Sequence, residues 1–400
     1  MAQELVAKVL RKLVPLPAKA PAAIVYADRV AMIEKWVLKE IPYEVVRVDG
    51  SVCLHPLILL RTLANLRHVD WNYVRHSRWR LLALAKQGYQ MHLLALLQHI
   101  SPKVVLTTID NSAVFHRLSL LHRAAQYYAI MNGLRSLIDL RLDLPPPPHP
   151  NAKMRMTHLF CFGEHEIDVY RRFSHEVEKF HVAGAFVWGC YREASSNRPG
   201  EVTHDLCYVS QWDGYHSYAQ YALAPDAQLR WPIFHSALSA METCLVRLLD
   251  ESGLSLLIAL RYEDCEQEKE YFRERFGPRV EFVEANRLDF SAYRAMDRAR
   301  LVVTLNSTCA VEAFGAGRKV LFCNMTAHPH FALQVAQAGL GYLEGGTFDD
   351  FKARVMELLD VDPAKYRDAT RDGARYLVND DPRNPVHERI RRLTLEAIAG

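Results

Sequence analysis

Short apolar segments alternate with amphipathic, helix-like segments along most of the chain, and no other feature of the sequence constrains the fold as much. Each apolar segment ends in a polar turn, after which a helical period begins. Strands separated by helices form parallel sheets with helices packed on both faces. In the first half of the chain, the segments that predict strands are residues 22–28, 43–50, 103–112, 126–133, 157–164 and 181–189.

A second series of the same kind follows a segment that predicts a linker. Residues 193–205 (EASSNRPGEVTHD) combine Ser, Asn, Pro and Gly, which is typical of an irregular connection. The series therefore predicts an α/β protein with two Rossmann-like domains, residues 1–200 and 205–363. In open parallel sheets, ligands bind beyond the carboxyl ends of the strands, so we expect functional residues in the turns there. The strand-like segments of the second half are residues 205–212, 254–262, 279–285, 299–308 and 318–324.

The composition is that of a globular protein and excludes several classes. The 400 residues are 50% hydrophobic, and a net charge of +3 gives no sign of a nucleic-acid-binding surface. No apolar run approaches the roughly 18 residues of a membrane span. Residues 1–13 lack the features of a signal peptide, and the eight cysteines are spread singly, without a CxxC pair. These features predict a cytoplasmic protein with reduced thiols.

The first 13 residues predict a basic amphipathic helix, in which Leu5, Val9 and Leu13 lie opposite Lys8 and Arg11. Such a helix either lies on an anionic membrane surface or packs against its own domain. The residues favour neither outcome, so peripheral contact with a membrane stays open.

The turn at Asn306-Ser307-Thr308 carries the strongest functional signal. It follows the apolar segment LVVTL and precedes the helix-like AVEAFGAG. Free backbone N–H groups and two hydroxyls at a helix N-terminus form a receptor for a phosphate. Glu312 follows Thr308 by one helical turn, so its carboxylate could reach sugar hydroxyls beside that phosphate. The alternative is an ordinary helix cap, although a capping box would place the acid three residues after the cap rather than four.

Two other strand ends of the second half carry candidate residues. Gln211 and Asp213 follow residues 205–210, where an Asp-Gly pair is also common in tight turns. Arg261 ends the segment LSLLIALRY, and its guanidinium could hold a carboxylate or phosphate in a bidentate manner. The alternative for Arg261 is an exposed ion pair with the acidic residues that follow it, which contributes little.

In the first half, Asp110, Asn111 and Ser112 end one strand-like segment and would open the next helix. Helix capping is the default interpretation of such a cluster. Glu164 follows Gly163 at another strand end, and we expect it, or Asp110 or Glu166, to accept a proton from a reacting hydroxyl. Because Gly163 permits a tight turn, Glu164 is preferred.

Metal chemistry is not expected. Asp360-Val361-Asp362 matches the DxD pattern of metal-dependent transferases, but it lies between a helix-like segment and Pro363, where a solvated helix end is the simpler interpretation. No pair of carboxylates suited to a divalent ion stands out, so we expect no metal and no cofactor.

The order of these motifs resembles that in GT-B glycosyltransferases. The pattern Y…D.ARLVVT.NST..VEA...G.KVLF resembles their nucleotide-binding C-terminal domain. Within that group the chain is most similar to bacterial surface-carbohydrate transferases, particularly the retaining β-Kdo transferases of capsule and O-antigen assembly. The segments TTIDNSAVFHRL, LFCFGEHEIDVY and YVSQWDGYHS support the narrower resemblance, which covers most of residues 100–330.

The resemblance implies a retaining transferase that moves Kdo from CMP-β-Kdo to a carbohydrate or lipid-linked saccharide by double displacement. It implies that residues 364–400 return toward the N-terminal domain. Asp213 matches the catalytic nucleophile, with Gln211 and Arg261 near the donor sugar. The nucleotide site would hold Ser307, Thr308, Glu312 and His328, although Pro329 opening a helix explains the His-Pro pair equally well.

Two alternatives remain at this stage. One is a GT-B transferase or a sugar-nucleotide epimerase that uses a UDP- or GDP-sugar. The other is a non-catalytic module that binds nucleotide sugars. A preference among CMP, UDP and GDP distinguishes the three.

Overall fold

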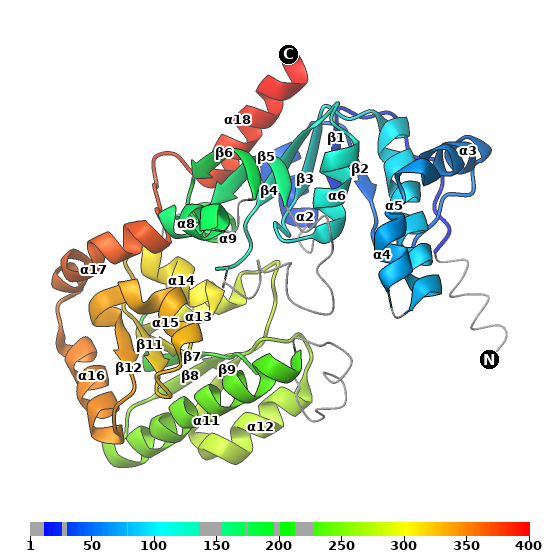
Figure 1. The fold of residues 1–400 in the computed structure, drawn as a ribbon. Coiled ribbons are helices and arrows are strands. Elements are labelled where there is room, and N and C mark those ends of the chain that lie inside the picture. The colour runs from blue at the N-terminus through cyan, green and yellow to red at the C-terminus, as the bar shows by residue number, and fades with distance from the viewer. Residues whose placement is uncertain are drawn as a thin grey trace. The chain divides into compact units, whose positions relative to one another are not determined.

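Two separate sheets of six parallel strands organise the computed structural model of this protein (Figure 1). The structure describes residues 12–25, 30–77, 79–135, 154–172, 175–195, 201–212 and 227–400. Helices flank each sheet, as the alternation predicts. Strands β1, β3 and β8 are buried at every residue, which is expected of parallel strands covered on both faces.

The first sheet has the strand order β2-β1-β3-β4-β5-β6. This order extends the flavodoxin-like arrangement by one strand, and it reverses direction between β1 and β3. The strands are β1 (Ala22–Val25), β2 (Tyr43–Val46), β3 (Val104–Thr107), β4 (Gln126–Ile130), β5 (Arg155–Cys161) and β6 (Glu176–Val182).

The second sheet has the order β12-β11-β10-β7-β8-β9, which is the classic Rossmann order with its reversal between β7 and β10. All of its strand pairs are parallel. The strands are β7 (His204–Val209), β8 (Leu256–Ala259), β9 (Val280–Val283), β10 (Ala299–Thr304), β11 (Val320–Asn324) and β12 (Tyr342–Glu344).

The described helices connect these strands. Those up to β7 are α2 (Val30–Ile33), η1 (Glu34–Leu38), α3 (Pro56–Asn65), η2 (Leu66–His68), α4 (Trp71–His76), α5 (Arg80–Ile100), α6 (Ala113–Leu121), α8 (Glu164–Arg172) and α9 (Phe186–Ala194). Those after β7 are α11 (Ala227–Ser252), α12 (Glu266–Phe276), η3 (Gly277–Arg279), α13 (Ser291–Asp297), α14 (Thr308–Gly315), α15 (Pro329–Val335), η4 (Ala336–Gly341), α16 (Phe348–Asp360), α17 (Pro363–Leu377) and α18 (Val386–Ala399).

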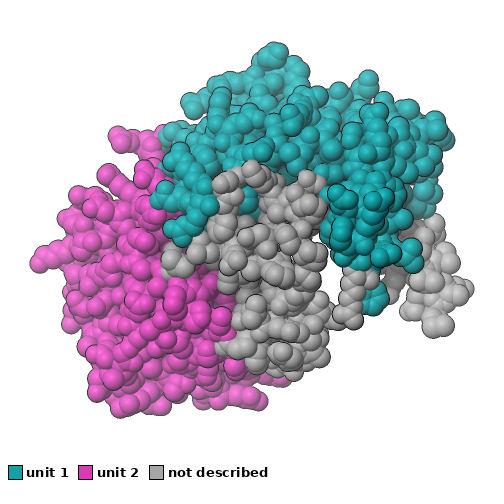
Figure 2. Space-filling view, in the orientation of Figure 1, with its two compact units in different colours: residues 1–161, 167–183, 384–400 teal, residues 162–166, 184–383 magenta. Residues whose placement is uncertain are grey.

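Each sheet belongs to one of two compact units, which are coloured separately in Figure 2. Unit 1 comprises residues 1–161, 167–183 and 384–400, and unit 2 comprises residues 162–166 and 184–383. The main boundary thus falls at 183/184, earlier than the expected linker at 193–205. The reason is α9, whose Tyr191 hydroxyl donates a hydrogen bond to Asp297 within unit 2.

The C-terminal helices divide between the units. Only α18 belongs to unit 1, where the Tyr128 hydroxyl donates to the carbonyl of Leu393 at 3.2 Å. Helix α17 stays in unit 2, because its buried Tyr366 exchanges two hydrogen bonds with the backbone of Val320. Of residues 364–400, for which a return toward the N-terminal domain is expected, α18 is assigned to unit 1 and α17 to unit 2.

One predicted strand is wrong. Residues 181–189 contain the end of β6 and then the start of α9, since Gly184 adopts a φ of +84° that ends the strand direction. The apolar residues beyond it lie on the buried side of α9. Among the described helices, none is both long and apolar enough to cross a membrane.

Candidate functional site

The reversal of strand order in the second sheet brings two turns together at its carboxyl edge. The turn after β7 contains Gln211, and the turn after β10 contains Asn306 and Ser307. A crevice at such a reversal is the general ligand position of open α/β sheets. The sequence-predicted residues Gln211, Ser307 and Thr308 therefore come from the two strands that flank the reversal.

The Gln211 side chain joins the two turns. Its Oε1 accepts hydrogen bonds from the Thr304 hydroxyl at 2.9 Å and from the backbone N–H groups of Leu305 and Asn306. Its Nε2 donates to Asn306 Oδ1 at 2.7 Å, and Asn306 in turn donates to Gln334 of α15 at 2.6 Å. The predicted contact of Gln211 with a donor sugar is untested, but the structure gives this amide a positioning role.

Helix α14 begins at this edge without a side-chain cap. Ser307 is its N-cap residue, and the Ser307 side chain forms no hydrogen bond to the first turn. Its carbonyl accepts from Val311 N at 3.0 Å, so the helix itself is regular. Ser307 and Thr308 are both half-buried. An N-terminus of this kind can bind a phosphate with its N–H groups and both hydroxyls.

Glu312 has a different environment from the one expected. Its side chain is almost fully buried, and its Oε2 accepts a hydrogen bond from the Tyr293 hydroxyl of α13 at 2.7 Å. The carboxylate thus faces α13 inside unit 2. The reason is helical geometry, since the residue one turn after the cap lies on the side where α14 packs.

Glu268 is a site residue that the sequence analysis missed. Its fully buried carboxylate accepts hydrogen bonds from the backbone N–H groups of Arg261 and Tyr262 and from the Ser210 hydroxyl. It therefore ties the carboxyl ends of β7 and β8 together from α12. An acid in a charged helix sequence such as EQEKEYFRERF gives no sign of this burial.

Arg261 is exposed at the end of β8, and its guanidinium donates to the carbonyls of Gln211 and Trp212 at 3.3 and 3.2 Å. Trp212 directly precedes Asp213, which lies outside the described residues. Within the part of the chain that the structure describes, no ion pair joins Arg261 to Glu263 or Asp264, the acidic residues that follow it. The guanidinium instead contacts the main chain that leads into the predicted nucleophile.

His328 is the N-cap of α15, with Pro329 in the first turn. Its Nδ1 accepts a hydrogen bond from His330 N at 3.2 Å, and its backbone is held by the buried side chain of Asn324. The structure thus supports the helix-start interpretation of the His-Pro pair. A nucleotide contact by His328 stays a prediction.

Asp110, Asn111 and Ser112 lie at the corresponding reversal of the first sheet, after β3. Asp110 is fully buried, and both of its carboxylate oxygens accept hydrogen bonds from the Arg135 guanidinium. Oδ2 also accepts from the Tyr170 hydroxyl at 2.7 Å. Because this carboxylate already has three internal donors, the structure does not favour it as a base for an acceptor.

Ser112 caps α6, since its hydroxyl accepts from Phe115 N at 3.3 Å. Asn111 is half-buried in the same turn. The default capping interpretation of this cluster is therefore correct for Ser112, and the acceptor contact predicted for Asn111 is untested.

Glu164 is exposed in the first turn of α8, whereas Glu166 is buried and accepts from Gly163 N at 3.1 Å. This arrangement supports Glu164 over Glu166 as a proton acceptor. Glycine is required at position 163 by a close backbone contact rather than by a tight turn. A Cβ there would lie 2.1 Å from the carbonyl oxygen of Tyr376, so only glycine permits this approach of two backbones.

The match to a family model covers β4 to β6 of unit 1 and most of unit 2, including the carboxyl edge described above. A family described as "putative O-antigen biosynthesis protein" matches residues 128–334, just over half of the chain. The chain belongs to this O-antigen biosynthesis family. Among curated proteins, no sequence matches the chain.

Solved structures with this fold show the GT-B arrangement of two Rossmann-like domains. A UDP-N-acetylglucosamine 2-epimerase has a TM-score of 0.53 at 16% identity, with 95% of each chain covered. The UDP co-structure of S. aureus MnaA has a TM-score of 0.50 at 13% identity, covering 95% of this chain and 98% of that one. The wall teichoic acid polymerase TagF, in its H548A form, has a TM-score of 0.51 at 9% identity, covering 96% and 90%. This member of the O-antigen family therefore has a GT-B fold.

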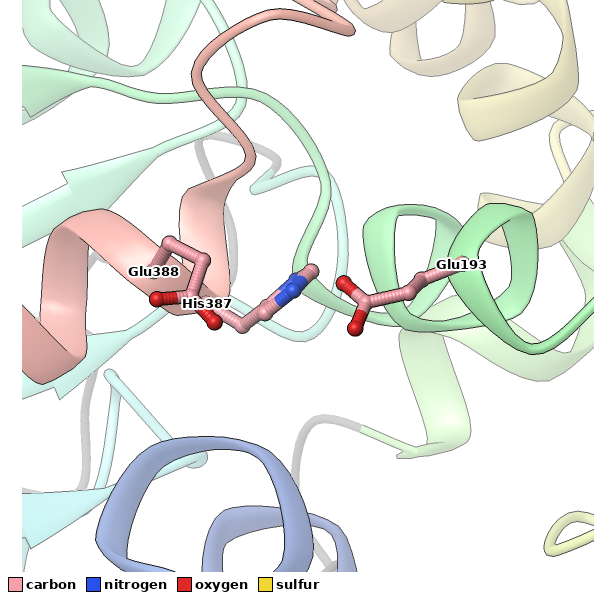
Figure 3. Close-up of side chains that lie close together, drawn as sticks. All are labelled: Glu193, His387 and Glu388. Carbon is pink, nitrogen blue, oxygen red and sulfur yellow. The ribbon is translucent and has the colours of Figure 1, made fainter. Parts of the chain in front are cut away.

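Two groups of side chains in this protein contain carboxylates that are candidate metal ligands. Asp362 is the N-cap of α17, and hydrogen bonds from the N–H groups of Lys365 and Ala364 lower the pKa of its carboxyl. The DxD pattern therefore spans the predicted helix end, at Asp360 of α16, and also the start of the next helix, at Asp362. Figure 3 shows Glu193 of α9 with His387 and Glu388 of α18. Glu193 belongs to unit 2 and the other two residues belong to unit 1. We therefore assign no metal site to these three side chains.

A cavity of about 770 Å³ lies at the opposite edge of the second sheet, beside the amino ends of β10 and β11. Arg300 and Lys319 line it with the end of α16, and the Lys319 amine donates to the carbonyl of Leu359 at 3.3 Å. The candidate site at the carboxyl edge is separate from this cavity, and open α/β sheets bind their ligands at the carboxyl edge.

Proposed function

We propose that this protein is a glycosyltransferase of O-antigen assembly that binds a nucleotide-sugar donor at the carboxyl edge of its second sheet. The observation that carries the proposal is the uncapped N-terminus of α14, held at the strand reversal by Gln211 and Asn306. Membership in the O-antigen family supports the biological role. Ser307 and Thr308 would bind the donor phosphate through their hydroxyls and the adjacent N–H groups.

The donor proposed is CMP-β-Kdo, and the acceptor is a carbohydrate or lipid-linked saccharide. The support is the resemblance of residues 100–330 to the retaining β-Kdo transferases. Arg261 is an exposed cation next to the turn after β7, and it suits a donor that carries a carboxylate on its sugar.

The proposed reaction is a double displacement. The Asp213 carboxylate attacks the anomeric carbon, the bond to the CMP oxygen breaks with its electron pair, and a glycosyl ester forms. The acceptor hydroxyl then attacks the same carbon and releases Asp213, while Glu164 takes the hydroxyl proton. Arg261, which contacts the carbonyl of Trp212, would favour the ionised form of the neighbouring Asp213.

Titration calorimetry with CMP, UDP and GDP, in the presence of EDTA, tests the nucleotide site. We expect CMP to bind about tenfold more tightly than the other two, a difference of about 1.4 kcal/mol. Preference for UDP or GDP would indicate another nucleotide-sugar enzyme, such as the epimerases that share this fold. Absence of binding to all three would contradict the site.

The substitution Asp213→Asn tests the nucleophile. We expect transfer to fall by roughly 10³-fold while the affinity for CMP stays unchanged, because the carboxylate acts on the sugar rather than on the nucleotide. Mass spectrometry of the wild-type protein with donor alone should show a sugar adduct on the peptide that contains Asp213. The exposed Asp368→Asn is the matched control. An adduct elsewhere, or near-normal turnover of Asp213→Asn, would remove Asp213 from the mechanism.

A further inference from the structure

Exposed apolar side chains concentrate on three consecutive helices of unit 1. Of the eighteen large hydrophobic residues that are exposed in the described part of the chain, eleven lie between residues 54 and 84. This stretch comprises α3, α4 and the first turn of α5, which lie side by side in Figure 1. Six of these residues, taken from the three helices and the segment before α5, form what we name the Leu-Trp face: Leu57, Leu60 (65% exposed), Leu63 (63%), Trp71 (50%), Trp79 (67%) and Leu81 (84%).

Helix α3 exposes its leucines and buries a polar residue, Asn65, beside Ile58. Its inward side holds Asn65, which is buried and donates to Gln98 of α5 at 3.1 Å. The Thr62 hydroxyl oxygen lies 3.3 Å from Nδ1 of His92, which is also on α5. Polar groups thus bind α3 to α5, while its leucines point outward. On soluble proteins, exposed apolar patches of this kind mark surfaces that bind another protein, a membrane or a ligand.

The same stretch carries a strong positive charge. Residues 54–88 contain six Lys or Arg and a single acid, Asp70, whereas the rest of the chain has 43 Lys or Arg against 45 Asp or Glu. Arg67, Arg75, Arg80 and Lys86 are exposed among the leucines and tryptophans. Asp70 is the N-cap of α4, where it accepts from Tyr73 N at 3.0 Å.

We propose that the Leu-Trp face docks on an anionic lipid bilayer. Leucine side chains enter the boundary of the acyl chains, tryptophan rings favour the headgroup level, and arginines bind lipid phosphates. A second copy of this chain is a poor occupant, because an isologous contact would bring two strongly basic surfaces together. The basic residues therefore favour a negatively charged partner surface, and the exposed leucines favour a partner with an apolar interior, such as a bilayer.

This surface is independent of the proposed transferase activity. It lies in unit 1, whereas the proposed nucleotide site lies in unit 2. Membrane binding and nucleotide binding can therefore fail separately, and each has its own measurement.

Co-sedimentation of the full chain with vesicles tests the proposal. The vesicles contain phosphatidylethanolamine with about 30% phosphatidylglycerol, or phosphatidylcholine alone. We expect at least about tenfold tighter binding to the anionic vesicles, since each cation near such a surface raises partitioning about fivefold. Binding should weaken as salt is raised.

The triple variant Leu60→Gln, Leu63→Gln, Leu81→Gln should lose at least about tenfold in vesicle affinity. All three side chains are exposed, so the thermal unfolding midpoint should stay within the range of surface substitutions. Leu288→Gln is the matched control, because Leu288 is 70% exposed in unit 2. A second variant, Arg75→Gln with Arg80→Gln and Lys86→Gln, should weaken binding to anionic vesicles only.

Three results would overturn the proposal. Absence of binding of the wild-type protein to both vesicle types would exclude membrane docking. Equal binding by the triple variant would place the contact on another surface. Self-association of the wild type that disappears in the triple variant, measured by sedimentation velocity without lipid, would show that a second copy covers the face. CMP titration of the triple variant reports separately on the nucleotide site and should be unchanged.

Discussion

The turns after β3 and after β10 resemble each other in sequence and differ in what their side chains do. Each follows a buried parallel strand at the reversal of its sheet, and each supplies a serine to the start of a helix. In the first sheet, Ser112 caps its helix and Asp110 is paired with Arg135 and Tyr170. In the second sheet, Ser307 leaves its helix uncapped.

This difference separates a structural turn from a candidate binding turn. Hydrogen-bonding groups that are satisfied inside the protein stabilise the fold and have no capacity left for a ligand. The turn after β10 is itself rigid, because Gln211 receives three hydrogen bonds from residues 304–306. A well-supported turn that leads into a helix start without a side-chain cap is an arrangement that favours ligand binding.

The largest expected effect is on the structural turn of unit 1. Asp110→Ala leaves the buried Arg135 guanidinium without its carboxylate, which should lower the free energy of unfolding by about 3–5 kcal/mol. Thermal and urea unfolding measure this loss. Nucleotide affinity, which resides in unit 2 in our proposal, should be unchanged where the variant is folded.

Glu388→Ala is the control for Asp110→Ala. Its ion pair with Lys39 is 3.5 Å long, and both side chains are more than 40% exposed. Such pairs contribute about 0–1 kcal/mol. A similar loss in the two variants would mean that the Asp110 pair is not the structural centre of its turn.

Acid should destabilise unit 1 before unit 2. His158 of β5 and His181 of β6 lie side by side, with 2.9 Å between His158 Nδ1 and His181 Nε2. Burial lowers the pKa of each imidazole to about 4. Both rings are neutral in the folded state at pH 6.5, whereas the unfolded chain takes up protons as the pH falls below that value. Stability is therefore complete above about pH 6.5 and is lost toward pH 4.

The loss should be about 3 kcal/mol for the pair, less than for two isolated rings because the two share a hydrogen bond and His181 is half-buried. Unfolding followed from pH 7 to pH 4 measures it. The double variant His158→Phe, His181→Phe should flatten the profile, and the exposed His76→Gln should not. An unchanged slope in the double variant would assign the acid sensitivity to other groups.

The smallest effects distinguish the two serines directly. Ser307→Ala should weaken CMP binding about tenfold through loss of a phosphate contact, with a change in unfolding free energy below about 0.5 kcal/mol. Ser112→Ala should do the reverse, costing about 1 kcal/mol of stability as a lost cap and leaving CMP affinity intact. Calorimetry and urea unfolding of both variants give the four values. Loss of stability without loss of affinity in Ser307→Ala would make the two turns equivalent.

Ten of the twelve strands in the described residues fall on predicted segments, because buried parallel strands need apolar runs and their turns need polar residues. The short edge strand β12 was not predicted. The segment 181–189 failed because the apolar residues of α9 continue those of β6 past Gly184. The strand–turn–helix junction at Ser307 was also predicted, since it depends only on neighbours in the chain. The environment of Glu312 was not, because its partner Tyr293 comes from another helix.

By itself, the sequence determined the two α/β series, the turns that carry polar residues and the junction at α14. These features depend on local period and on burial, which neighbouring residues encode. Tertiary structure decided which polar groups are already satisfied. Arg135 reaches Asp110 across 25 residues, Glu268 closes on β7 and β8 from α12, and Gly163 admits the backbone of α17. Such contacts depend on the packing of distant segments, and the residue types alone do not specify which partners meet.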